Sequence, residues 1–139
     1  MIVLDTNVVS ELMKTAPSES VRRWALHQPG PSLCITAITL AEILYGIERL
    51  PGGRRQEVLR STATDVFASF ADITLPFDVQ AATRYSSMVI VRDQLGRPIN
   101  GFDAQIASIC AVHGCSLATR NTRDFEHTGI DLINPWTTD

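Results

Sequence analysis

Four acidic residues occupy positions where a carboxylate could take part in chemistry. Asp5 directly follows the apolar run Met1–Leu4, and Glu42 lies among apolar residues in "ITLAEILYGIE". Asp103 falls in "NGFDAQIASICAVHG", and Asp124 falls in "TRNTRDF". Four carboxylates that converge would repel one another, and a hard divalent cation would remove that repulsion. All-oxygen ligation favours Mg²⁺ or Mn²⁺, and such a cluster suits hydrolysis of a phosphodiester bond.

Each of these acids also has an ordinary structural interpretation. Asp5 would serve as the N-cap of a following helix, and Asp124 would be a simple loop acid. Asp103 would be the third residue of a helix capped by Asn100, where the helix dipole favours a carboxylate. Glu42 would line the solvent edge of an amphipathic helix. Singly, these alternatives stay open; a shared site is favoured only when the four acids are taken together.

The elements that would carry these acids alternate between short apolar strands and helices. Strands are predicted over 1–4, 32–36, 72–77, 116–119 and 131–134. Helices are predicted over 8–13, 19–26, 37–49, 54–70, 78–95 and 100–113. This order indicates an α/β sandwich with a mostly parallel sheet. In such sheets ligands bind beyond the carboxyl ends of the strands, where Asp5 and the loop 119–124 would lie.

Helical periodicity is clearest over the segment that contains Glu42. A single stripe is predicted to hold its apolar side chains, which are Leu40, Ile43, Leu44, Ile47 and Leu50. Gly46 costs this helix about 1 kcal/mol relative to alanine. Close approach by another group would explain a glycine here.

Length and composition are those of an ordinary globular protein. The 139 residues favour a single domain over 1–139, and 45% hydrophobic residues supply a core. No apolar run approaches the roughly 20 residues of a membrane span. Met1 leads directly into the first predicted strand, which leaves no room for a signal peptide. We therefore expect a cytoplasmic protein without membrane association.

Charge and cysteine usage limit the classes of partner and site. The net charge of −3 is unlike that of proteins with a broad basic nucleic-acid-binding face. Lys14 is the only lysine, so the other basic residues are arginines, whose planar forks bind phosphate. A GC-rich genome would explain the same bias. The three cysteines form no CxxC pair and have no histidine at ligand spacing, so buried free thiols are expected rather than zinc ligands.

The acidic motifs resemble those of a known family. The chain is similar to PIN-domain ribonucleases, specifically the VapC-type (FitB-like) toxins of bacterial type II toxin–antitoxin pairs. The resemblance runs nearly end to end, through "MIVLDTNVVSELMK", "ITLAEILYGIERLPGGRR", "GRPINGFDAQIASICAVHG" and "LATRNTRDFEHTGIDLINPW". It implies a PIN-like three-layer α/β/α sandwich with a small, mostly parallel central sheet. It also implies a metal-dependent endoribonuclease that uses Mg²⁺, with Mn²⁺ as a substitute.

The resemblance assigns roles to individual residues of this sequence. Asp5 and Asp103 would be the principal Mg²⁺ ligands, and Glu42 and Asp124 would complete the acidic site directly or through water. The residues that would orient these ligands are Thr6, Asn7, Thr119 and Asn121. Many PIN domains carry an acid two residues after the strand-ending threonine. Here that position is Asn121, and the acid follows three residues later as Asp124.

The resemblance also implies partners. The substrate would be RNA, often structured RNA such as tRNA, and a cognate antitoxin would neutralise the toxin. Such antitoxins typically insert an arginine or a bulky side chain into the acidic groove. The family further implies a homodimer, which sometimes pairs into larger assemblies with the antitoxin.

Other classes of protein fit the residues less well. A receiver domain also has acids at strand ends, but it needs a lysine at a later strand end, and Lys14 lies on the first helix. A haloacid-dehalogenase-type phosphatase needs a second aspartate where this chain has Asn7. The serious alternative is a non-catalytic PIN-fold binding module that acts through protein or RNA contacts. Intact carboxylates argue against it, because such a module has no use for their mutual repulsion.

Overall fold

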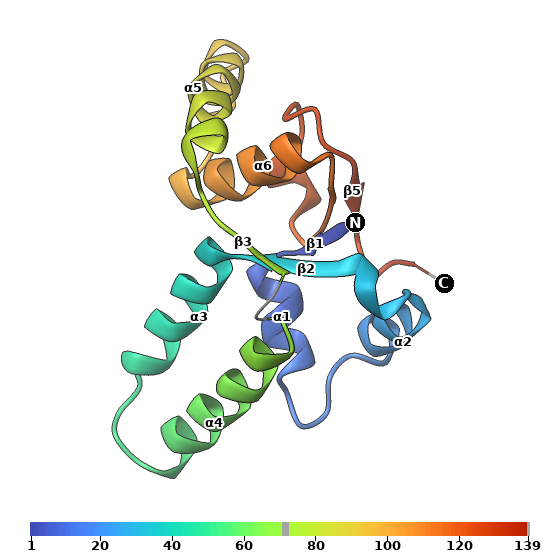
Figure 1. Cartoon of the computed structure of the whole chain (residues 1–139), viewed down its shortest axis with the longest axis vertical. Coiled ribbons are helices and arrows are strands. Elements are labelled where there is room, and N and C mark those ends of the chain that lie inside the picture. Colours follow the sequence, from blue (N-terminus) through green and yellow to red (C-terminus); the bar gives the residue numbers. More distant parts are fainter. Residues whose placement is uncertain (71–72, 139) are drawn as a thin grey trace.

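A five-stranded parallel sheet forms the middle of the molecule in the computed structural model, which describes residues 1–70 and 73–138 (Figure 1). The strand order is β3-β2-β1-β4-β5, and every pairing between neighbours is parallel. The strands are β1 (Ile2–Leu4), β2 (Leu33–Thr36), β3 (Thr74–Leu75), β4 (Ser116–Ala118) and β5 (Leu132–Ile133). The prediction of a small, mostly parallel sheet is confirmed. Residue 72 of the predicted third strand lies outside the described residues.

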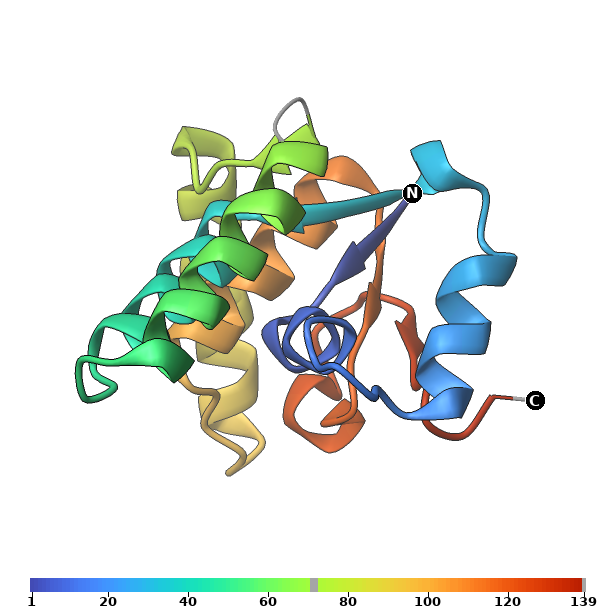
Figure 2. The same ribbon diagram turned by 90° about the horizontal axis from the view of Figure 1, so that it is seen from below.

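Helices cover both faces of this sheet, which confirms the three-layer sandwich. One face carries α1 (Thr6–Leu12), α2 (Glu19–His27), α3 (Ala37–Glu48) and α4 (Arg54–Ser69), as Figures 1 and 2 show. The other face carries α5 (Val79–Gln94) and α6 (Gly101–His113). Short 3₁₀ segments include η1 (Gly30–Ser32) and η3 (Thr122–Phe125). Every predicted helix is present, with bounds that differ by two residues or fewer.

The core divides into two halves because successive strand residues face opposite sides of the sheet. Val3, Cys34 and Leu117 point toward α5 and α6, where they pack with Ile106 and Phe125. Their chain neighbours point the other way, toward the four-helix face; these are Leu4, Ile35 and Ala118. The three cysteines are buried free thiols, as predicted.

The apolar stripe predicted for α3 is wrong at one position. Ile43 and Ile47 are buried, but Leu44 is 43% exposed. The buried stripe faces the sheet and α4, whereas Leu44 lies on the outer side together with the exposed Tyr45. Ile43, Leu44 and Tyr45 are consecutive, and consecutive side chains point in different directions from a helix, so the three cannot all face the sheet.

Most helices begin with a side chain that satisfies an otherwise unpaired backbone N–H group. Asp5 caps α1, and Thr36 caps α3 directly after β2. Asp78 caps α5, and Asn100 caps α6. Gly114 ends α6 in the left-handed conformation, at φ 64°, which glycine adopts without strain. Because α1 and α3 start where β1 and β2 end, their first turns lie at the carboxyl edge of the sheet.

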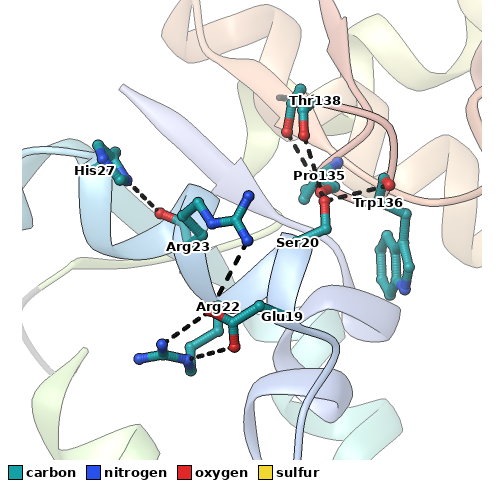
Figure 3. A network of polar contacts seen from close by, with 8 residues as sticks. All are labelled: Glu19, Ser20, Arg22, Arg23, His27, Pro135, Trp136 and Thr138. Carbon is teal, nitrogen blue, oxygen red and sulfur yellow. Dashed lines mark hydrogen bonds and ion pairs between the residues drawn. The ribbon is translucent and has the colours of Figure 1, made fainter.

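The C-terminal segment is held against α2 by the network in Figure 3. The Ser20 hydroxyl lies 2.9 Å from the carbonyl oxygen of Pro135 and 3.3 Å from those of Trp136 and Thr138. The guanidinium of Arg120 covers the Trp136 ring at 5.2 Å. These contacts hold the segment that follows β5, an edge strand of the sheet, against α2. Within the described part of the chain, no helix has both the length and the apolar character of a membrane span.

Truncation of a core residue on α6 is expected to cost far more stability than the same truncation on the surface. Ile106 is fully buried, so Ile106→Ala should lower the free energy of unfolding by about 3 kcal/mol. Leu26 on α2 is 69% exposed, and Leu26→Ala, which removes a side chain of the same size, is the matched control, with an expected change below about 1 kcal/mol. Urea unfolding of both variants measures the difference. Equal losses would contradict the described packing.

Candidate active site

The ends of three neighbouring strands bring the first candidate residues together. Because β1 lies between β2 and β4 in a parallel sheet, their carboxyl ends are adjacent. Asp5 follows β1, Thr36 ends β2, and Thr119 follows β4. The backbone N–H of Asp5 donates to the carbonyl of Ala118 at 2.9 Å, which continues the β1–β4 pairing to the edge.

Asp5 is almost completely buried, with 4% of its surface exposed. One carboxylate oxygen, Oδ1, accepts a hydrogen bond from the Thr6 backbone N–H at 2.8 Å. The other, Oδ2, accepts from the Thr119 hydroxyl at 2.8 Å and from the Asn7 amide at 3.3 Å. Burial raises the pKa of Asp5 despite these three donors. Asp5 therefore caps α1 and also presents a buried carboxylate at the sheet edge, so the two interpretations are not exclusive.

The predicted orienting residues form a network around Asp5. The Asn7 side-chain amide reaches both Asp5 and the Thr119 hydroxyl, and its Oδ1 accepts from the Arg120 backbone N–H at 3.2 Å. Thr119 also accepts from the backbone N–H of Asn121 at 3.1 Å. Asn121 thus enters the network through its main chain. These bonds fix the ends of β1 and β4 relative to each other.

Glu42 lies on α3, the helix that follows β2, and points toward the same edge. Its Oε1 accepts a hydrogen bond from the Thr6 hydroxyl at 2.8 Å. Thr6 uses its only hydroxyl proton in that bond, so the buried Thr39 hydroxyl, 3.1 Å away, donates to Thr6. Burial, and secondly the charge of Asp5, raises the pKa of Glu42. The half-buried Glu42 is therefore turned toward Asp5, not outward on a solvent-facing edge.

Asp103 occupies the predicted position in the first turn of α6. Asn100 Oδ1 accepts from the backbone N–H groups of Phe102 at 2.9 Å and Asp103 at 3.4 Å. Burial, followed by the charges of Asp5, Asp124 and Glu42 in that order, raises the pKa of Asp103 to about 6, against a smaller lowering by Arg92. All four predicted acids therefore lie in one electrostatic neighbourhood.

Asp103 and Asp124 differ from Asp5 in having carboxylates without a hydrogen-bond donor among the described residues. Asp124 lies in η3, with its side chain exposed. Its backbone N–H donates to the carbonyl of Asn121 at 3.0 Å. Both carboxylates consequently keep their lone pairs available for another group.

The donor set of this site suits a hard divalent cation, because every candidate ligand is a carboxylate oxygen. Over residues 1–70 and 73–138, no three His, Cys, Asp or Glu side chains lie close enough to form a ready-made metal site. Mutual repulsion disfavours tight convergence of carboxylates unless a cation neutralises it. The chemistry of the donors therefore fits Mg²⁺ or Mn²⁺, although a closed ligand shell is not preformed.

Sequence reasoning missed Arg92, a buried residue on α5. Only 5% of it is exposed, and its guanidinium donates to the carbonyl of Asp124 at 2.8 Å. It shares the buried stripe of α5 with Ala81 and Met88, which precede it by eleven and four residues. An arginine that falls in an apolar helical stripe is the signal that could have identified it.

The fold and the acidic sheet edge define a class of α/β domain, and comparison with known proteins identifies the family. The model of the PIN domain matches residues 2–131. VapC ribonuclease Y4jK of Sinorhizobium fredii is 39% identical over 137 residues, which cover 98% of each chain. Toxin FitB of Neisseria gonorrhoeae is 33% identical over 98% of this chain and 99% of its own.

Further relatives agree with this assignment. The tRNA(fMet)-specific endonuclease VapC of Shigella flexneri is 32% identical over 96% of each chain. The solved structure of FitAB bound to an IR36 DNA fragment superposes with a TM-score of 0.94 at 32% identity, covering 100% of this chain and 98% of that one. The chain belongs to the PIN-domain family, and its resemblance to VapC-type and FitB-like toxins is confirmed.

Removal of one charge from the site is expected to stabilise the metal-free protein. The folded-state pKa of Asp103, about 6, exceeds its unfolded value of about 4, so the folded chain binds this proton more tightly. The resulting destabilisation is complete above about pH 6 and absent below about pH 4. After allowance for solvent screening and the lost helix-dipole contact, Asp103→Asn should add about 1 kcal/mol at neutral pH.

Urea unfolding in EDTA at several pH values measures this gain. Asp93→Asn, at an exposed position on α5, is the matched control and should change stability little. A loss of stability in Asp103→Asn at neutral pH, or a gain that persists at acid pH, would contradict the electrostatic description of the site.

Proposed function

We propose that this protein is a Mg²⁺-dependent endoribonuclease that acts as the toxin of a toxin–antitoxin pair. The observation that carries the proposal is the gathering of four acids at the carboxyl edge of one sheet, where the charges of Asp5, Asp124 and Glu42 raise the pKa of Asp103. Ligands bind at this edge in α/β proteins. Relatives named VapC ribonuclease and tRNA(fMet)-specific endonuclease support the same activity.

Asp5 and Asp103 would be the principal ligands of the cation, with Glu42 and Asp124 bound directly or through water. When bound, Mg²⁺ or Mn²⁺ supplies activation of water and neutralisation of charge on the leaving oxygen. The chain itself orients the ligands. Thr119 and Asn7 hold one oxygen of Asp5, and the Thr6 hydroxyl holds Glu42. These supports fix the directions of two carboxylates before any cation or substrate arrives.

The proposed substrate is structured RNA such as tRNA. A relative that is 32% identical is named a tRNA(fMet)-specific endonuclease, which supports this choice. The net charge of −3 disfavours a phosphate backbone at the bare acidic site. A cation held by the carboxylates would remove that conflict, and exposed arginines would supply the remaining phosphate contacts.

A cognate antitoxin is the proposed protein partner. A groove of about 360 Å³ runs from Thr6 and Glu42 over Ile43, Gly46 and Ile47. Open space lies above Gly46, since a Cβ built there would meet no atom within 4 Å. An apolar antitoxin segment in this groove would reach the acidic site at its end. The solved FitAB structure superposes on this chain, and its relative FitB is named a toxin, which supports a partner of this kind.

The other proposals follow from the family and from the surface of α5. A homodimer would bury exposed apolar side chains of this helix and of its C-cap, among them Val79 at 82%, Ile90 at 53% and the C-cap Leu95 at 52% exposure. A single PIN domain over 1–139 and a cytoplasmic location stay predictions.

Cleavage of RNA is expected to depend on added Mg²⁺ and on the carboxylates. Purified protein should cleave total RNA when Mg²⁺ is present, and the cleavage should stop when EDTA is added. Asp5→Asn and Asp103→Asn should each lose at least about 100-fold in rate while remaining folded, because each removes a ligand charge. Asp93→Asn is the matched control at an exposed position. Sequencing of the new RNA ends would identify the substrate.

Two results would contradict the proposal. Undiminished cleavage in EDTA would exclude a metal-dependent reaction, and undiminished cleavage by both variants would place the reaction elsewhere. Binding of RNA without turnover under all conditions would instead support the non-catalytic binding module.

A further inference from the structure

Arg92 is a buried cation with an unusual set of partners. It lies in the last turn of α5 and is 5% exposed. In the part of the chain that the structure describes, no carboxylate oxygen lies within 4 Å of its guanidinium. A buried charge needs other compensation, and backbone carbonyl oxygens supply it here.

Three carbonyl groups from two separate segments accept its hydrogen bonds. Nε donates to the carbonyl of Arg97 at 2.6 Å. Nη1 donates to the carbonyls of Asp124 at 2.8 Å and Glu126 at 2.9 Å. In return, the Arg97 backbone N–H donates to the carbonyl of Arg92 at 2.9 Å. One side chain thus joins the turn after α5 to η3.

Each of these segments leads to a carboxylate of the acidic site. The turn that contains Arg97 runs into Asn100, the cap of α6, three residues before Asp103. The other segment, η3, carries Asp124 itself. The Arg92 charge also favours the ionised form of Asp103. An exposed ion pair, Arg97–Glu126 at 2.9 Å, joins the same segments, but exposed pairs contribute little.

We propose that Arg92 is a positioning residue that fixes Asp124 relative to Asp103 and thereby sets the affinity of the site for its cation. The inference rests on the proposed function. Arg92 acts through the backbone of η3 and touches neither cation nor substrate. Its planar fork serves carbonyls in two directions at once, which the single ammonium group of lysine does not reproduce.

Calorimetric titration with Mn²⁺ tests this role. Arg92→Lys keeps the charge and removes the fork, and it should weaken Mn²⁺ binding about tenfold, as loss of ligand-orienting contacts typically does. Arg92→Gln, which is neutral and retains a donor, provides a second variant if the lysine variant does not fold. Asp124→Asn should also weaken binding. Because Arg92 acts through Asp124, Arg92→Lys should have no further effect in the Asp124→Asn background.

Controls separate this role from general stability. Arg84→Lys, at an exposed position of the same helix, should leave Mn²⁺ affinity unchanged. Hydrogen exchange should increase in residues 122–126 of Arg92→Lys more than in the rest of the chain. Unchanged Mn²⁺ affinity, or affinity losses that add in the double variant, would overturn the inference. The proposed cation site itself would still be tested by the effect of Asp5→Asn on Mn²⁺ binding. Absence of Mn²⁺ binding by the unsubstituted protein would overturn the proposed function and this inference with it.

Discussion

The structure depends on holding several negative charges at one edge of a sheet, where none of the four acids has an ion-pair partner among residues 1–70 and 73–138. Asp5 is the extreme case, since 4% of it is exposed and its pKa is raised by burial. Hydrogen bonds from Thr6, Asn7 and Thr119 offset part of that cost. Such an arrangement is unfavourable in isolation and becomes favourable once a cation binds. The proposed cation site would explain why the chain keeps this unfavourable arrangement.

Parallel topology explains why a chain of this size can assemble the site. The ends of β1, β2 and β4 meet at one edge, and helices begin immediately after β1 and β2. Residues of the first helical turns are consequently held by both strand pairing and helix capping. Asp5 performs both tasks, because one oxygen caps α1 and the other is held by the neighbouring strand end. Short strands suffice, since helices on both faces bury them.

Much of the site could be predicted from sequence because its residues stand in local contexts with physical meaning. Asp5 follows an apolar run, Glu42 interrupts an apolar helix, and Asp103 lies three residues after a capping Asn100. These contexts also indicated the helices and strands, whose periods and caps are local properties. The family resemblance added the roles of Thr6, Asn7 and Thr119, whose side chains the structure places in hydrogen-bonding contact with Asp5, Glu42 or each other.

Other features depend on contacts that no local pattern encodes. The partners of Arg92 are carbonyls up to 34 residues away, so only its position in a buried stripe could have indicated its role. Leu44 is exposed because neighbouring elements decide which side of α3 is covered. The convergence of Asp103 with Asp5 likewise follows from packing of α6 against the sheet. Spacing alone could not distinguish it from an ordinary helix-terminal acid.

The central claim is that the four acids form one cation site at the carboxyl edge. Anomalous diffraction from crystals soaked in MnCl₂ tests it most directly, because manganese is located without reference to activity. We predict an anomalous peak between Asp5 and Asp103, with Glu42 and Asp124 bound to it directly or through water. Absence of a peak at this edge in crystals that bind manganese elsewhere would contradict the account.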